Sequence, residues 1–263
     1  MRVETTTSIK RIKRWQTITI IALIVALTIW SAIGTNFSFY DVFSGTGLIA
    51  QFIFIDMLPP SFQATESLLQ AVLETIYMGV VGMVVGALIA LFLSFLAAST
   101  TTPHVVIQVI VRAFTSVLRN IPSLIWVILL VAAYGIGPTV GTLSLVIGSV
   151  GFLTRVFADT LEEIDMGQVE ALQATGANYV QVLMQAVFPQ FFPGFVAWSL
   201  YNLEINIRAS TIIGMVGGGG IGFAIQKSIK LFQYKEVSMA VLLVLVLILF
   251  TETLTSKIRE KVI

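Results

Sequence analysis

Long apolar runs separated by short polar segments dominate the chain. A membrane-spanning helix needs about 20 mostly apolar residues, and the runs predict such helices over residues 17–34, 68–98, 191–207 and 237–255. The first run has the charged start and apolar centre of a secretory signal. Its apolar stretch is longer than a signal core, however, and no small-residue cleavage site follows it cleanly, which favours an uncleaved helix.

A charge-free stretch between Arg119 and Arg155 predicts two more helices. Gly135-Ile136-Gly137-Pro138 interrupts it, and this composition is typical of a turn. Two helices of about 14 to 17 residues with a tight reversal between them would bring both arginines to the same side of a membrane. The pattern therefore predicts an all-α, polytopic membrane protein with about six transmembrane helices.

Composition agrees with this class and excludes several others. Of the 263 residues, 57% are hydrophobic and 11% are charged, whereas a soluble domain is usually about a quarter charged. The chain has no cysteine and one histidine, His104, which argues against a thiolate or histidine-rich metal site and a cysteine nucleophile. We expect no metal and no cofactor in this chain. A net charge of +1 gives no reason to expect nucleic acid as a partner.

The distribution of basic residues predicts an orientation. Loops rich in lysine and arginine stay in the cytoplasm, and the segment 35–67 has none. The N-terminal tail has Arg2, Lys10, Arg11, Lys13 and Arg14, and the C-terminal tail has Lys257, Arg259 and Lys261. Both termini are expected to be cytoplasmic, in the bacterial inner membrane. Lys227, Lys230 and Lys235 conflict with this topology, because they would lie outside.

We divide the chain into residues 1–67 and 68–263. The first part would comprise a cytoplasmic tail, the first transmembrane helix and an external segment, and the second a core membrane domain. Within the core, the Gly82-x-x-x-Gly86 spacing, together with Gly79, is typical of close helix packing. Arg112 and Arg119 are interpreted as cytoplasmic anchors of the next helix.

An acidic segment at 158–189 is the most informative loop. Residues 167–175 predict a short helix, Gly176 a break, and residues 177–188 a second helix ending at Pro189. A helix–turn–helix on the cytoplasmic face suits docking into a groove on a soluble partner. Glu170 would offer a charged contact, while Ala171 and Ala174 permit close approach. An amphipathic hairpin lying in the membrane interface is an equally open interpretation.

The spacing Glu-Ala-x-x-x-x-Gly, followed after nine residues by an apolar-x-apolar-Pro ending, resembles the coupling loop of ABC importer permeases. Glu170, Ala171, Gly176 and Pro189 occupy the matching positions, and the chain departs from the family pattern at Leu172, Ala186 and Phe188. Several segments resemble the phosphonate-type branch of this superfamily. They are 170–177, Ile164-Asp165-x-Gly167, Glu204-Ile205-Asn206-x-Arg208 and Arg119-Asn120-Ile121-Pro122. The resemblance extends from about Thr75 to the C-terminus.

This resemblance implies a type I importer permease that forms a homodimer. Its partners would be two cytoplasmic ATP-binding subunits, which hold ATP and Mg²⁺, and an extracytoplasmic substrate-binding protein. The chain contains no Gly-x-x-x-x-Gly-Lys-Ser/Thr phosphate loop, so we expect no ATPase site in it. Energy would enter through the coupling residues Glu170, Ala171, Ala174, Thr175, Gly176 and Pro189.

Polar residues after the fifth predicted helix are candidates for the translocation pathway. Ionisable groups near membrane depth are costly and often functional, and an arginine fork with hydroxyl donors matches a tetrahedral oxyanion. The candidates are Glu204, Asn206, Arg208, Ser210 and Thr211, with Asn120 and Ser123 upstream. The i,i+4 spacing of Glu204 and Arg208 leaves open that they only neutralise each other.

Gly217, Gly218, Gly219 and Gly220 predict an irregular, buried turn. In the resembled family this region contributes to an external gate, and we assign the four glycines to that gate as structural elements. A close helix crossing is the alternative interpretation.

These patterns predict an importer for phosphonate or a related phosphorus oxyanion, such as phosphate or phosphite, by alternating access. A permease for methionine or another small solute is the principal alternative. A secondary transporter would leave the coupling-loop pattern unexplained. A membrane enzyme acting on a lipid phosphate would need a cluster of aspartates or a serine–histidine pair, which the sequence does not offer.

Overall fold

The computed structural model describes residues 3–262, and among these residues every regular element is a helix. The all-α prediction is therefore confirmed. The chain divides into two compact units, Met1–Asp56 and Met57–Ile263, and each is considered by itself. The structure thus assigns residues 57–67 to the larger unit, where Met57 and Ala64 pack against the cluster that contains Leu68 and Ile221.

The smaller unit contains α1 (Val3–Gly34), α2 (Phe39–Gln51) and the start of a π-helical segment (Phe52–Met57). Within α1, Lys13–Gly34 is long and apolar enough to cross a membrane, and none of its most apolar window is buried inside the protein. The Ser38 hydroxyl accepts a hydrogen bond from the Asp41 amide and thereby caps α2. The predicted first membrane helix is present.

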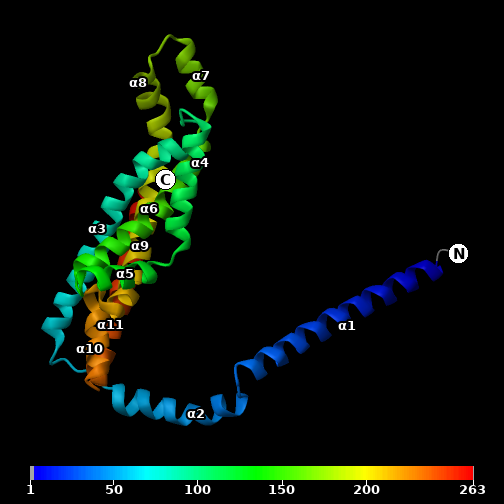
Figure 1. Cartoon of the computed structure of the whole chain (residues 1–263), viewed down its shortest axis with the longest axis vertical. Coiled ribbons are helices and arrows are strands. Elements are labelled where there is room, and N and C mark those ends of the chain that lie inside the picture. Colours follow the sequence, from blue (N-terminus) through cyan, green and yellow to red (C-terminus); the bar gives the residue numbers. More distant parts are fainter. Residues whose placement is uncertain (1–2, 263) are drawn as a thin grey trace. The chain divides into compact units, whose positions relative to one another are not determined.

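The larger unit is a helical bundle. Its elements are α3 (Thr65–Ala97), α4 (Val105–Asn120), α5 (Ser123–Tyr134), α6 (Pro138–Glu162), α7 (Met166–Ala174), α8 (Tyr179–Val182), a π-helical segment (Leu183–Val187), α9 (Phe188–Ile213), a second π-helical segment (Gly214–Gly218), α10 (Gly220–Lys230) and α11 (Tyr234–Val262). Figure 1 shows α7 and α8 beyond one end of this bundle and α10 at the opposite end. We call these the α7 end and the α10 end.

Small residues let the central helices α3, α6 and α9 approach closely. A Cβ atom on Gly86 would lie 2.4 Å from Cβ of Ser149 on α6, and one on Gly79 would lie 2.9 Å from Cγ1 of Ile207 on α9. Gly82 faces both α6 and α9, and a Cβ atom on it would lie 3.1 Å from Nδ2 of Asn206 on α9. The packing interpretation of the three glycines is confirmed.

Within residues 3–262, five helices are long and apolar enough to span a membrane, and a sixth span results if the bent pair α4–α5 counts as one. The two halves of this pair meet at 84°. Pro122 causes the break, because a residue before proline is pushed out of the helical region; Ile121 accordingly has φ −86° and ψ 116°.

The predicted division of the 119–155 stretch needs correction. Its reversal lies where we expected it, with Gly135 at φ +87°. The helix before the reversal, however, has only 12 residues and belongs with α4, whereas α6 has 25 residues and continues to Glu162. Asp159 does not end the helix, because Arg155 one turn earlier on α6 pairs with it at 3.0 Å, so the loop predicted from residue 158 begins later.

Candidate functional site

A helical hairpin forms the α7 end of the bundle. The Asp165 carboxylate accepts a hydrogen bond of 2.9 Å from the Gly167 amide and starts α7. Gly176 follows the helix at φ +82°, a left-handed conformation that favours glycine. The short helix expected over 167–175 and the break at Gly176 are both confirmed.

The second arm of the hairpin differs from the prediction at Pro189. A capping box starts α8. The Gln181 amide donates to Oδ1 of Asn178 at 2.9 Å, and the Asn178 amide donates to Oε1 of Gln181 at 2.8 Å. The chain then stays helical from Tyr179 into α9. Pro189 does not end a helix, because it occupies the first turn of α9, where the missing amide hydrogen costs little.

One face of the hairpin is anchored and the other is free. Val169 and Val182 are buried in a cluster with Leu161 and Phe191 from the bundle, so the hairpin is attached rigidly to the ends of α6 and α9. Five of the six predicted coupling residues lie on the hairpin and are exposed: Glu170, Ala171, Ala174, Thr175 and Gly176. The sixth, Pro189, is exposed in the first turn of α9. A small-residue surface with one exposed carboxylate on a rigid support is suited to contact with another protein.

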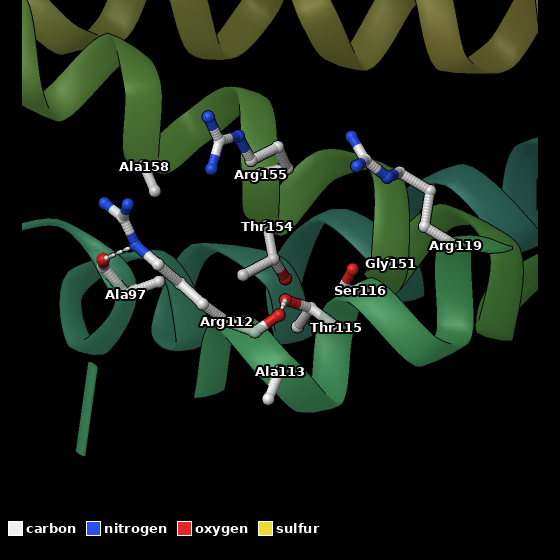
Figure 2. Close-up of a pocket in the computed structure, with 10 residues that line it drawn as sticks. All are labelled: Ala97, Arg112, Ala113, Thr115, Ser116, Arg119, Gly151, Thr154, Arg155 and Ala158. Carbon is white, nitrogen blue, oxygen red and sulfur yellow. Dashed lines mark hydrogen bonds between the residues drawn. The ribbon is translucent and has the colours of Figure 1, made fainter. Parts of the chain in front are cut away.

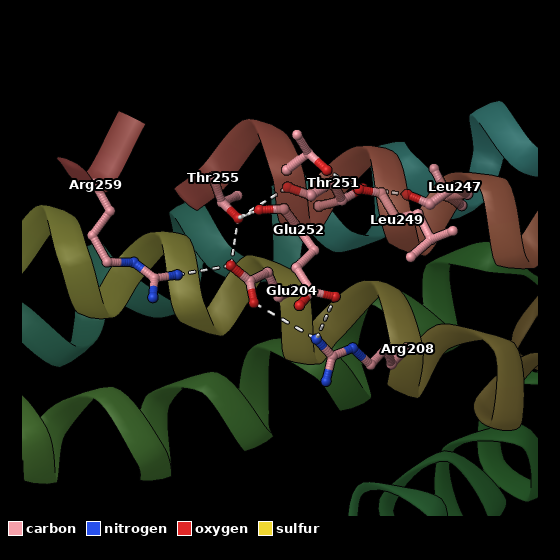
Figure 3. A network of polar contacts seen from close by, with 9 residues as sticks. Glu204, Arg208, Leu247, Leu249, Thr251, Glu252, Thr255 and Arg259 are labelled. Atoms are coloured by element: carbon pink, nitrogen blue, oxygen red, sulfur yellow. Dashed lines mark hydrogen bonds and ion pairs between the residues drawn. The ribbon is translucent and has the colours of Figure 1, made fainter. Parts of the chain in front are cut away.

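Glu204 forms the centre of an ion-pair network between α9 and α11 (Figure 3). Its side chain is only 7% exposed, and its Oε1 atom lies 2.7 Å from Nη2 of Arg259. The Thr255 hydroxyl donates a short hydrogen bond to the same oxygen. On the other oxygen, Arg208 approaches at 3.6 Å, and Arg208 also lies 3.9 Å from Glu252.

This network favours the neutralising interpretation of Arg208. The guanidinium lies between two carboxylates, which compete with any passing anion. Arg208 nevertheless keeps 49% of its side-chain surface exposed. Arg259 and Thr255 were missed as partners of Glu204, since sequence distance alone cannot show that α11 returns alongside α9.

We expect Arg259→Met to lower the free energy of unfolding by roughly 2–4 kcal/mol, because it leaves the buried Glu204 carboxylate with the longer Arg208 contact as its one remaining ion pair. The measurement is thermal unfolding of the detergent-solubilised protein. The double variant Glu204→Leu/Arg259→Met should recover part of the loss, because no buried charge is then left without its partner. A double variant less stable than Arg259→Met would contradict this account.

The other predicted pathway residues occupy different environments. Asn206 and Ser210 are buried, at 3% and 0% exposure. The Asn206 amide donates hydrogen bonds to Ser149 Oγ at 3.0 Å and Asn202 Oδ1 at 3.3 Å, and the Ser210 hydroxyl donates to the Ile207 carbonyl. Within a single copy of the chain these two side chains therefore serve packing and do not reach its surface, contrary to the prediction.

Asn120, Ser123 and Thr211 remain accessible in part. Asn120 is exposed beside the α4–α5 break and donates to Ser116 Oγ at 3.2 Å. Ser123 is half-buried at the start of α5. Thr211 is half-buried in α9 near the glycine-rich turn. These three residues come from three different helices, α4, α5 and α9.

The four consecutive glycines form a buried irregular turn between α9 and α10, as predicted. Gly217, Gly219 and Gly220 have φ values of +105°, +84° and +66°. The Gly217 carbonyl accepts a hydrogen bond of 2.9 Å from the Gly137 amide, and the Thr75 hydroxyl accepts one from the Ile221 amide at 2.9 Å. The turn is thus held by both α3 and the α5–α6 reversal.

Comparisons with known proteins agree with this architecture. Residues 82–262 match the family described as "Binding-protein-dependent transport system inner membrane component". The chain is 37% identical over 205 residues to the phosphite transport system permease protein PtxC of Stutzerimonas stutzeri, covering 78% of this chain and 74% of that protein. It is 38% identical over 212 residues to the phosphate-import permease protein PhnE of Mycolicibacterium smegmatis, covering 80% of this chain and 40% of that protein.

A solved structure shares the fold. The methionine ABC transporter MetNI, in an inward-facing conformation, contains a chain with a TM-score of 0.68 and 23% identity, and the match covers 77% of this chain and 99% of that chain. At this level of identity the likeness concerns the fold alone.

Proposed function

We propose that this chain imports a phosphorus oxyanion. It belongs to the family of binding-protein-dependent transport system inner membrane components. It is therefore a multi-pass permease of an ABC importer in the bacterial inner membrane. Its relatives at 37–38% identity are named for phosphite and phosphate, and a shorter relative from Escherichia coli is named for phosphonate at 35% identity. A methionine permease from Vibrio cholerae is more distant, at 24% identity.

The rigid hairpin is the observation that supports the coupling step. Two cytoplasmic ATP-binding subunits, carrying ATP and Mg²⁺, would contact the exposed face around Glu170, Ala171 and Ala174. Because Val169 and Val182 bury the opposite face in the bundle, a displacement of the hairpin is transmitted to α6 and α9. In this proposal the ATP-binding subunits hydrolyse ATP and this chain does not. When those subunits close on each other, the chain converts their movement into a change in the positions of its helices.

The same contact defines the orientation. If the hairpin meets cytoplasmic subunits, the α7 end is cytoplasmic and the α10 end faces the extracytoplasmic binding protein. The glycine-rich turn then lies on the outer side, in keeping with its assignment to a gate. In that orientation, and with α4–α5 counted as one of five spans in the larger unit, the end of α11 would be cytoplasmic. With α1 as a sixth span, the N-terminus would be on the same side.

Two copies of the chain would form the pathway between them. A large part of the surface of α4 is apolar and exposed, including Val109, Ile110 and Phe114. Such surface is suited to lipid or to a second permease copy. Substrate selectivity would be shared with the binding protein, which delivers its ligand at the α10 end.

The experiment that tests this function is ligand-dependent ATP hydrolysis by the reconstituted complex. The binding protein is supplied loaded in turn with phosphite, phosphate, methylphosphonate or methionine. We expect stimulation with the phosphorus oxyanions and none with methionine. Stimulation by methionine alone would keep the permease assignment and overturn the substrate, and a chain that assembles with no ATPase subunit would overturn the coupling role.

A further inference from the structure

A pocket between α4 and α6 lies near the α7 end of the bundle, where α6 ends at Glu162. Figure 2 shows the side chains that line it. One residue that we predicted for the pathway adjoins it, because Asn120 follows Arg119 and donates a hydrogen bond to Ser116 Oγ. The cavity has a volume of about 300 Å³, which is at the lower end of the range for small-ligand sites. Three arginines surround it, namely Arg112 and Arg119 from α4 and Arg155 from α6. Three hydroxyl side chains complete its polar lining: Thr115, Ser116 and Thr154.

The three arginines differ in how fully they are paired. Arg112 is held by the Ala97 carbonyl at 2.7 Å and by a short ion pair with Glu162. Arg155 pairs with Asp159 one turn further along α6, at 3.0 Å. Arg119 has no carboxylate partner among the residues that the structure describes, and its side chain is exposed. Two carboxylates therefore face three guanidinium groups, and the pocket carries an excess positive charge.

An unpaired hydroxyl points to a missing ligand. Thr154 is 0% exposed and lines the pocket. Its Oγ1 atom has no hydrogen-bond partner in the part of the chain that the structure describes. Buried hydroxyl groups are almost always bonded, and each exception calls for an explanation. By contrast, the neighbouring Thr115 hydroxyl donates to the Val111 carbonyl at 2.9 Å.

A glycine makes the close approach of α4 possible. A Cβ atom on Gly151 would lie 2.8 Å from the Arg119 backbone nitrogen and 3.1 Å from Cβ of Leu118. The missing side chain lets the end of α4 lie directly against α6, which brings Arg119 to the rim of the same pocket as Arg155. From the sequence, Arg112 and Arg119 were interpreted as cytoplasmic anchors, because the sequence does not show that α4 packs against α6.

We propose that this pocket binds a tetrahedral phosphorus oxyanion. Guanidinium forks bind phosphate oxygens with directed, charge-assisted hydrogen bonds, Arg119 supplies the uncompensated charge, and the Thr154 hydroxyl finds its missing partner in a ligand oxygen. The inference rests on the proposed function for its location, which is the cytoplasmic half of the permease. There the ligand is either the substrate before release or the phosphate of an anionic lipid headgroup.

The test measures binding of [³²P]phosphate to the permease–ATPase complex in phosphatidylcholine nanodiscs, without binding protein. We expect Arg119→Gln to weaken binding about tenfold or more, because it removes the uncompensated cation. Thr154→Val should weaken binding severalfold while leaving thermal stability equal or higher, because it removes an unpaired buried hydroxyl. A purely structural role for Thr154 would not produce that combination.

The matched control is Lys257→Gln, which removes one positive charge from an exposed residue of α11 outside the pocket and should leave binding unchanged. A second arm replaces part of the lipid by phosphatidylglycerol. If phosphatidylglycerol lowers phosphate binding to the wild type, and this competition is absent in Arg119→Gln, the lipid headgroup is an occupant of the pocket. If phosphate binding is the same with and without phosphatidylglycerol, the occupant is the free anion.

Two outcomes would overturn the site. One is phosphate binding that is equal in wild type, Arg119→Gln and Lys257→Gln. The other is an absence of phosphate binding together with an absence of Arg119-dependent retention of phosphatidylglycerol. The proposed function fails separately, if a loaded binding protein does not stimulate ATP hydrolysis. Arg119-dependent phosphate binding without such stimulation would retain the pocket and refute the transport assignment.

Discussion

Substrate uptake by the assembled transporter should fall more than about tenfold in Glu170→Lys, while the permease remains folded. Glu170 is exposed on α7, so its replacement disturbs no internal contact, and reversal of a charge at a docking surface typically costs several kcal/mol of binding free energy. The measurement is uptake into proteoliposomes together with co-purification of the ATPase subunit. Loss of uptake with an unchanged unfolding temperature places the defect at the docking surface.

A matched control for this variant is Glu163→Lys. It makes the same change of charge at an exposed residue directly after α6 and outside α7. We expect it to retain uptake within about twofold of wild type, since isolated exposed charges contribute little. Normal uptake in Glu170→Lys, or equal losses in both variants, would contradict a specific role of α7 in docking.

The second large effect is expected from one added methyl group. A Cβ atom on Gly141 of α6 would lie 2.1 Å from the Gly218 carbonyl oxygen and 2.5 Å from the end of Met78. The backbone oxygen cannot move without displacing the glycine-rich turn. We therefore expect Gly141→Ala to lower the unfolding temperature by roughly 5–10 °C, which corresponds to an overpacking cost of about 3 kcal/mol.

Gly137→Ala is the control, because a Cβ atom there meets nothing within 4 Å and its φ of 161° is extended backbone that alanine also adopts. It lies one turn before Gly141 and keeps its amide hydrogen bond to Gly217. Its unfolding temperature should equal that of wild type. If Gly141→Ala is as stable as Gly137→Ala, the turn is not packed against α6 as described.

Four of the membrane helices were readable from the sequence because apolar runs of this length have few alternatives, whereas the division of the 119–155 stretch was not. The first arm of the hairpin and its break were equally readable. Asp165 and Asn178 are local caps, Gly176 is a local break, and all three act within a few residues of their own position. The resemblance to ABC importer permeases, which rests on this hairpin, agrees with the family match over residues 82–262.

The predictions that failed concern contacts between distant segments. Asn206 looks like a polar residue of a pathway when only α9 is considered, but Gly79 and Gly82 bring α3 against that side of α9. Within a single copy of the chain, Asn206 and Ser210 are both buried. Pro189 looks like a terminator in isolation, yet proline also fits the first turn of a following helix.

By itself, the sequence determined the number of apolar runs, the caps and breaks of the hairpin, and the glycine positions at which helices approach, because each of these depends on local geometry or on hydrophobic length. Only the tertiary structure decided which charges meet. Glu204 is neutralised by Arg259 from α11, and Arg119 is left uncompensated beside Arg155 and the unpaired Thr154. Electrostatic partners are set by distance in space, and helix packing alone determines that distance.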